Sequence, residues 1–156
     1  MVNPSKTRRT KIKKNNVNNL KIMGINCNGL SGKSDSLLAC ISELKPMVFL
    51  VQETKYMKKG QFKLNNFEIF ESIRTSGGGS LMTGVHSKLE PIKVSDGTEE
   101  DVEILVVEGE IEGRKIRFIN GYGPQESADR DKRVKFFALL RTGSNKSKTY
   151  WSFSLH

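Results

Sequence analysis

Strand-like and helix-like patterns of apolar residues alternate along the first third of this chain. The segment Met47–Glu53 holds consecutive apolar residues after Pro46, a pattern typical of a strand that is buried on both faces. We expect an earlier strand at Leu20–Asn26 and, between the two strands, a short amphipathic helix over residues 35–44 with Ser34 as its N-cap. This order predicts a strand–helix–strand unit with a right-handed crossover.

Shorter apolar segments predict further strands in the middle of the chain. Glu112-Gly113 separates two long apolar segments and is a hairpin signal, whereas Asp96–Asp101 has the composition of an acidic turn. The chain therefore belongs to the α/β class, with many strands and few helices. The further strands are expected at Phe67–Ile73, Leu89–Val94, Val102–Ile111 and Lys115–Tyr122.

The two ends of the chain differ from its body. Residues 1–19 are basic, rich in Asn and poor in large apolar residues, so we expect a disordered leader. Residues 20–140 form the folded part, and its last helix is expected after a cap at Ser127 or Asp129. Residues 141–156 have no sustained period and are expected to form an irregular tail. The inner face of the last helix is expected to consist of Val134, Phe137, Ala138 and Leu140.

The net charge of +9 is concentrated at the ends. Residues 1–34 contain eight Lys and Arg and no acid, while residues 35–140 are nearly neutral. A basic arm such as Lys6–Lys14 suits nucleic-acid phosphates or nuclear import, although a solvated leader accounts for it equally well. With no apolar run of membrane-spanning length and no apolar signal segment, we expect an intracellular protein that does not enter a membrane. Cys27 and Cys40 lack metal-ligand spacing, so we expect free thiols.

Three short polar blocks each follow a strand-like segment: Asn26–Leu30, Gln52–Lys55 and Asn120–Gln125. Ligands of α/β sheets bind where the carboxyl ends of strands meet, so these blocks can share one edge. Together they supply amides, a carboxylate, a phenol and a lysine, which suit a hydrated divalent cation and a phosphate. Considered alone, Glu53 is explained equally well as an ordinary glutamate at the place where a strand ends and meets water.

Through these blocks, from about Leu20 to Leu140, the chain resembles the endonuclease/exonuclease/phosphatase family, which includes abasic-site endonucleases and the endonuclease domains of non-LTR retrotransposons. The Gln-Glu-Thr-Lys and Tyr-Gly-Pro-Gln sequences are most similar to the retroelement branch. The resemblance implies a four-layer αββα sandwich that hydrolyses phosphodiesters with Mg²⁺ (or Mn²⁺), with DNA as the first candidate partner.

The resemblance also assigns roles to side chains. It implies that Glu53 is the principal metal ligand, that Asn26 fixes the metal or the scissile phosphate, and that Tyr122 donates a hydrogen bond to a phosphate oxygen. These three residues are the implied catalytic set. A second, uncharged metal ligand is implied at Asn28, where many members of the family carry an aspartate. Lys55 supports the site, and Gln125 faces the nucleic-acid backbone.

The sequence departs from the family pattern in its second half. The Gly-Asp-x-Asn and terminal Ser-Asp-His blocks, which position and activate the attacking water in the family, are absent from the sequence. We therefore expect a truncated sandwich in which a single carboxylate binds Mg²⁺ weakly. A sheet face without its covering half would be apolar and exposed, which predicts marginal stability and self-association.

These observations favour one function and leave two alternatives open. The first is a Mg²⁺-dependent endonuclease that derives from a retroelement and is incomplete or inactive as this chain. The second is a non-catalytic basic protein that binds nucleic acid through its leader. The third is a gene remnant without a selected function.

Overall fold

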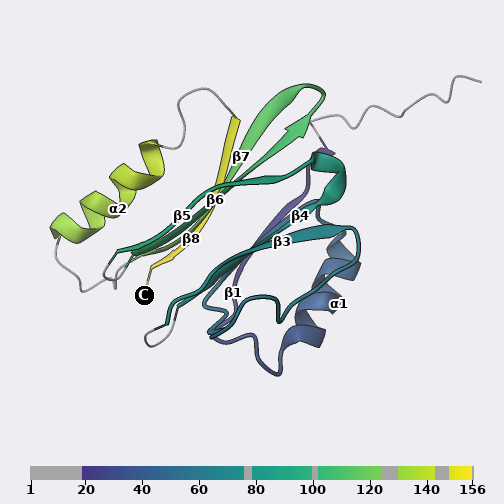
Figure 1. Cartoon of the computed structure of the whole chain (residues 1–156), viewed down its shortest axis with the longest axis horizontal. Coiled ribbons are helices and arrows are strands. Elements are labelled where there is room, and N and C mark those ends of the chain that lie inside the picture. Colours follow the sequence, from purple (N-terminus) through teal and green to yellow (C-terminus); the bar gives the residue numbers. More distant parts are fainter. Residues whose placement is uncertain (1–18, 76–78, 100–101, 124–129, 143–147, 156) are drawn as a thin grey trace, which may run out of the picture.

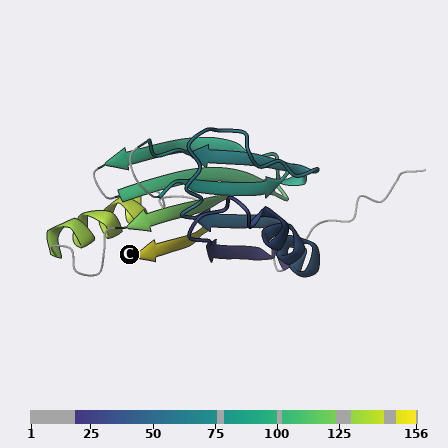
Figure 2. The ribbon, with the colours of Figure 1, turned by 90° about the horizontal axis from the view of Figure 1, so that it is seen from below.

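The computed structural model describes residues 19–75, 79–99, 102–123, 130–142 and 148–155. Its strands form two four-stranded sheets that pack face to face. Helix α1 (Ser34–Leu44) covers the outer face of the first sheet, and α2 (Arg130–Thr142) lies on the outer side of the second (Figures 1 and 2). The predicted α/β sandwich with flanking helices is therefore confirmed.

The first sheet contains the predicted strand–helix–strand unit. Its strand order is β1-β2-β4-β3, with β1 parallel to β2 and the other pairs antiparallel. Every residue of β2 is buried, because this strand lies inside the sheet and between α1 and the second sheet. The strands are β1 (Ile22–Asn26), β2 (Val48–Gln52), β3 (Phe67–Ser72) and β4 (Leu81–His86).

The second sheet has the strand order β5-β6-β7-β8. The predicted hairpin joins β6 to β7 through Glu112 and Gly113, whose φ angles of 52° and 74° fit the left-handed conformation that tight hairpin turns require. A short 3-10 helix, η2 (Ser87–Leu89), precedes the first strand of this sheet. The strands are β5 (Ile92–Glu99), β6 (Val102–Ile111), β7 (Arg114–Gly123) and β8 (Lys148–Leu155).

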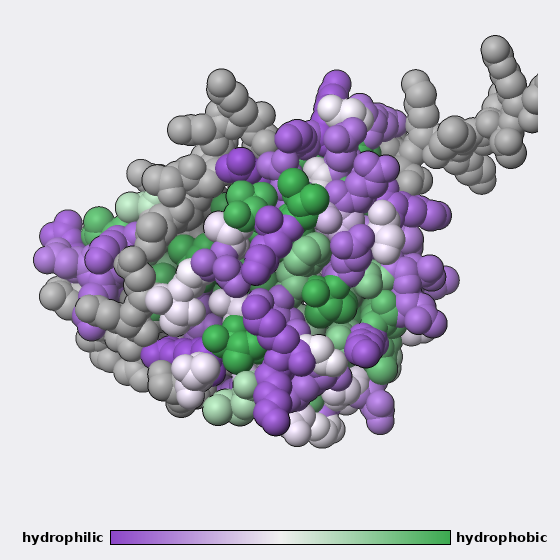
Figure 3. Space-filling view, viewed as in Figure 1, coloured by the Kyte–Doolittle hydropathy of each residue, from purple (hydrophilic) through white to green (hydrophobic). Residues whose placement is uncertain are grey.

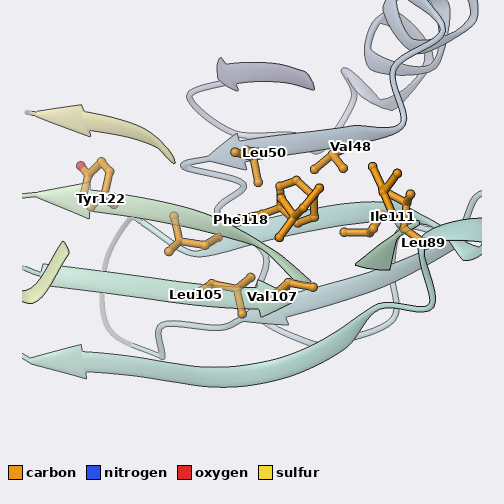
Figure 4. Packing of buried hydrophobic residues seen from close by; sticks show 11 residues of the cluster. Val48, Leu50, Leu89, Leu105, Val107, Ile111, Phe118 and Tyr122 are labelled. Atoms are coloured by element: carbon orange, nitrogen blue, oxygen red, sulfur yellow. The ribbon is translucent and has the colours of Figure 1, made fainter. Parts of the chain in front are cut away.

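The main hydrophobic core lies between the two sheets (Figure 4). Large side chains of β2, β6 and β7 alternate toward this space, as the period of two in a strand requires. Tyr122 lies at one end of the cluster, and Leu89 and Ile111 lie near the other (Figure 4). The buried members are Val48, Leu50, Leu81, Val85, Leu89, Leu105, Val107, Ile111, Ile116, Phe118 and Tyr122.

Smaller cores attach the helices to the outer faces of the sheets. Leu37 and Ile41 of α1 pack in a cluster that contains Phe49, whose ring lies against Gly84 of the neighbouring strand. On the second sheet, Phe136 of α2 packs with Val106 and Ile119. Both helices are therefore fixed by apolar burial, although α2 is fixed through fewer described residues.

The structure corrects the details of both predicted helices. The N-cap of α1 is Lys33 without a side-chain cap, and Ser34 lies inside the helix, with its hydroxyl 3.4 Å from the carbonyl oxygen of Leu30. In α2, Phe136 is fully buried, whereas Val134 and Phe137 are 57% and 40% exposed. The predicted inner face of α2 was therefore wrong at Val134 and Phe137, because Phe136 packs against the sheet instead. The side chain of Leu140 lies outside the described part of the chain.

Two segments predicted to be irregular form strands. Residues 96–99 extend β5 by pairing with β6, so the expected acidic turn is absent there, since ladder pairing outweighs local composition. Strand β8 lies within the expected irregular tail and pairs in parallel with β7. Its apolar residues at 151, 153 and 155 alternate with Ser152 and Ser154, a strand period that the surrounding polar residues conceal. The domain boundaries themselves stay predictions, and the leader lies outside the described residues.

The face of the molecule in Figure 3 is mostly hydrophilic among its described residues. In Figure 3, hydrophobic residues form separate groups among hydrophilic ones. Within the described part of the chain, no helix is long and apolar enough to cross a membrane. The expected self-association stays a prediction. Large hydrophobic residues that are exposed include Leu44, Met57, Ile92, Val94, Val134 and Phe137.

Candidate active site

Three predicted site residues come together at one end of the two sheets. Asn26 is the last residue of β1, Glu53 follows the last residue of β2, and Tyr122 lies near the end of β7. The parallel register of β1 and β2 places Asn26 opposite Gln52, directly before Glu53. The ends of β1, β2 and β7 therefore place an amide, a carboxylate and a phenol next to one another.

Asn26 and Glu53 are directly hydrogen-bonded. The Asn26 Nδ2 donates to Glu53 Oε1 over 2.8 Å, and the backbone N–H of Asn28 donates to Asn26 Oδ1 over 3.0 Å. The second bond fixes the orientation of the Asn26 amide, because only its oxygen can accept. Asn26 therefore holds one carboxylate oxygen of Glu53 in a defined position.

Glu53 is 2% exposed and has a left-handed backbone with φ of 54°. Its carbonyl oxygen accepts from the Gly29 N–H over 2.7 Å and from the Cys27 thiol over 3.3 Å. Left-handed backbone at a non-glycine residue costs about 1–3 kcal/mol and persists where the surroundings determine it. Asn28 and Lys55 also have positive φ angles, of 44° and 54°. Left-handed backbone thus occurs at three of the predicted site residues, and it also occurs at turns elsewhere, such as Lys45 and Glu90.

Tyr122 completes the cluster. Its side chain is hydrogen-bonded to Glu53, and burial, together with the negative charge of Glu53, raises the pKa of Tyr122 to about 12. The phenol is therefore protonated at neutral pH and can donate its hydrogen to the carboxylate. A ligand that takes a hydrogen bond from Tyr122 must first compete with Glu53.

Two lysines lie beside the loop after β1. Lys55 Nζ donates to Asn28 Oδ1 over 2.5 Å, and Lys33 Nζ donates to the Cys27 carbonyl oxygen over 2.9 Å. Burial raises the pKa of the Cys27 thiol, so this cysteine has little thiolate character. The lysines place positive charge on the loop after β1, at Cys27 and Asn28, an arrangement that suits the phosphate of a ligand.

A polar network under the site was not predicted from the sequence. Gln52 Nε2 donates to Asn120 Oδ1 over 2.6 Å, and Asn120 Nδ2 donates to the carbonyl oxygens of Val51 and Met82 over 3.1 and 3.0 Å. Both side chains are buried between the sheets. The sequence did contain a signal for the burial of Asn120, because this residue lies two positions before Tyr122 and so shares its face of the strand.

The donor set fits a weakly held Mg²⁺ or Mn²⁺ ion. Mg²⁺ in proteins keeps several waters and is often held by only one or two carboxylates, and Glu53 with the Asn26 and Asn28 amide oxygens can supply such a set. The oxygen of Asn28 already accepts from Lys55, and that of Asn26 accepts from the Asn28 N–H, so a cation would have to compete with both donors. Among the described residues, no group of three or more His, Cys, Asp or Glu is arranged to hold a metal. Gln125 lies outside the described residues.

Comparison with known proteins supports the fold through structure alone. No family model and no curated protein matches the sequence. The endonuclease domain of TRAS1, a telomere-specific non-LTR retrotransposon, matches with a TM-score of 0.64 and 14% identity, over 85% of this chain and 58% of that one. An AP endonuclease from Archaeoglobus fulgidus matches with a TM-score of 0.58 and 21% identity, over 86% of this chain and 56% of that one.

A third solved structure, D. rerio TDP2 complexed with a single-strand DNA product, matches with a TM-score of 0.61 and 15% identity. The match covers 86% of this chain and 58% of that one. The chain therefore has the fold of the endonuclease/exonuclease/phosphatase superfamily, as its motifs predicted. It spans less than three fifths of the length of these three structures. At such low identity, the similarity concerns the fold.

Proposed function

We propose that this chain carries part of the site of a divalent-metal-dependent phosphodiesterase that acts on nucleic acid, with DNA as the first candidate. The observation that carries the proposal is the Asn26–Glu53–Tyr122 cluster, in which an amide and a phenol are hydrogen-bonded to the buried carboxylate. A purely structural glutamate at a strand end does not need a phenol and an amide that both bond its carboxylate. The retroelement origin is part of the proposal, and it is supported by the Gln52–Lys55 block.

Each residue of the cluster would have a distinct task. Glu53 would hold Mg²⁺ (or Mn²⁺), assisted by the amide oxygens of Asn26 and Asn28. The bound ion would supply charge neutralisation at the phosphoryl oxygens. Tyr122 would donate its hydrogen to a phosphate oxygen of the ligand in place of its present bond to Glu53. Lys55, with Gln125, would orient the nucleic-acid backbone by contacts to phosphates.

The present chain is expected to be a poor catalyst. Proton transfer by a positioned acid or base contributes about 10²–10⁴-fold to enzymatic rates, and the Gly-Asp-x-Asn and Ser-Asp-His blocks that provide this function in the family are absent from the sequence. A single carboxylate also binds Mg²⁺ weakly. We therefore propose that this chain binds metal and nucleic acid but hydrolyses phosphodiesters only slowly.

A non-catalytic basic protein is the second candidate, and one observation favours it. Six of the first 14 residues are Lys or Arg, and this stretch contains no acidic residue. Such a segment binds phosphate backbones without reading sequence, and it suits nuclear import. In that case binding would reside in residues 1–19, not at Glu53.

Nicking of supercoiled DNA in Mg²⁺ tests the proposal. The purified chain is compared with Glu53→Gln, with Glu68→Gln as the matched control on the exposed side of β3, and with a variant lacking residues 1–19. We expect slow nicking that EDTA and Glu53→Gln abolish and that Glu68→Gln retains. Nicking that survives Glu53→Gln would overturn the assignment. DNA binding that disappears with residues 1–19, without any nicking, would favour the second candidate.

A further inference from the structure

A second buried carboxylate, Glu103, lies directly behind the candidate site. It is located on β6 opposite Tyr122 of β7 in the antiparallel register, so both side chains project from the same face of the sheet. Glu103 is 0% exposed, and its negative charge contributes to the raised pKa of Tyr122. The Asn26–Glu53–Tyr122 cluster does not include this residue.

The contacts of Glu103 only partly satisfy its carboxylate. Its Oε2 accepts the Ser80 N–H over 2.9 Å, and its Oε1 lies 3.7 Å from Nη1 of Arg74. The Oε1 atom is buried and has no hydrogen-bond donor within bonding distance among the described residues. Burial raises the pKa of Glu103, whereas the Ser80 N–H and Arg74 act in the opposite direction. A carboxylate buried in this way is costly, and a hydrophobic residue would avoid the cost.

The Glu103 contact continues through Ser80 to the loop that carries Glu53. The Thr54 N–H donates to the Ser80 carbonyl oxygen over 3.1 Å, and the Lys55 N–H donates to the Gly79 carbonyl oxygen over 2.9 Å. Ser80 has a φ of 68°, in the left-handed region. The Glu103 carboxylate therefore fixes a strained turn, and that turn holds the two residues that follow Glu53.

Gly79 lies very close to the Glu103 carboxylate. A Cβ atom at residue 79 would overlap Oε1 of Glu103, and the φ of Gly79 is 80°. Only glycine combines this backbone with the close approach of the carboxylate. The position of Glu103 therefore requires glycine at residue 79. A glutamate that was buried without a role would not require a particular residue there.

We infer that Glu103 is a positioning residue of the candidate site. It orients Glu53 through the Gly79–Ser80 turn, as the acceptor of the Ser80 N–H. The role in metal binding rests on the proposed function, whereas the mechanical link from Glu103 to Thr54 and Lys55 does not. Two separate measurements therefore test the two parts.

The first measurement is amide hydrogen exchange by NMR on the full chain. Glu103→Ala removes the acceptor of the Ser80 N–H, so we expect exchange of the Ser80, Thr54 and Lys55 amides to accelerate together, by about tenfold or more. Glu103→Gln keeps an acceptor oxygen and is expected to restore protection to within about threefold of the original chain. The control is Glu108→Gln, which alters a glutamate on the same strand that pairs with Lys115 and Arg117.

The result that would overturn the inference is acceleration at Ser80 alone, with Thr54 and Lys55 unchanged. If Glu103→Ala does not fold, Glu103→Gln decides: its amide oxygen can still accept the Ser80 N–H, so a loss of Thr54 and Lys55 protection beyond about threefold in this variant would overturn the inference. The second measurement is Mn²⁺ affinity, which we expect to fall about tenfold in Glu103→Ala and to return in Glu103→Gln. Absence of Mn²⁺ binding in the original chain would refute the proposed function, while the exchange result would still test the positioning role.

Discussion

At the scale of single residues, the candidate site is defined by how its neighbours constrain Glu53. Asn26 and Tyr122 both bond its carboxylate, and its backbone is held in the left-handed region. Such strain is retained at ligand-binding and catalytic positions more often than elsewhere. The sequence drew attention to Asn26, Glu53 and Tyr122 because their polar blocks follow apolar segments, and the family resemblance then assigned their roles. It did not indicate Glu103, since this residue lies inside a predicted strand and no local pattern shows that its side chain is buried.

Alkaline titration of Tyr122 is the first prediction at this scale. Its pKa of about 12 means that the fold favours the neutral phenol. The stability that Tyr122 contributes is therefore complete below its ordinary pKa of about 10 and is lost as the pH rises through about 12. Ultraviolet absorbance should show a late phenolate transition that Tyr122→Phe removes. Glu53→Gln should move the transition to lower pH, because the charge of Glu53 disappears while burial remains. An unchanged transition in Tyr122→Phe would contradict the assignment.

At the scale of elements, strand β2 organises the first sheet. It is buried along its whole length, and Phe49 fits against the neighbouring strand where Gly84 leaves room for its ring. The sequence predicted β2 well, because a short run of four consecutive apolar residues is typical of a strand buried on both faces. It predicted β8 poorly, since a strand that pairs at the end of a sheet receives its stability from β7 and not from its own composition.

Substitution of Gly84 tests the packing of β2. A Cβ atom at this position would overlap the Phe49 ring, so Gly84→Ala should destabilise the fold by about 1–3 kcal/mol. The matched control is Gly97→Ala in β5, where an added Cβ meets no atom within 4 Å. Urea unfolding followed by circular dichroism measures both free energies. Equal effects of the two substitutions would show that Phe49 does not pack as described.

At the scale of the whole molecule, the two sheets join at the same end where the site lies. Gln52 and Asn120 link β2 to β7 by a hydrogen bond that spans the two sheets, so the position of Glu53 relative to Tyr122 depends on how the sheets pack. The sequence predicted the sandwich and the meeting of the three blocks, because strand periods and motif positions are local properties. The bond between Gln52 and Asn120 joins residues 68 positions apart, and no local pattern specifies it.

The measurement that tests the central claim most directly is Mn²⁺ binding by the full chain, followed by electron paramagnetic resonance of the free ion. We predict weak binding of a single ion, with a dissociation constant on the order of 10⁻⁴–10⁻³ M, because one carboxylate contributes the charge. Glu53→Gln should abolish this binding, and Glu68→Gln should retain it. Binding that persists in Glu53→Gln, or none in the original chain, would contradict the claim that Glu53 is the centre of a metal-dependent site.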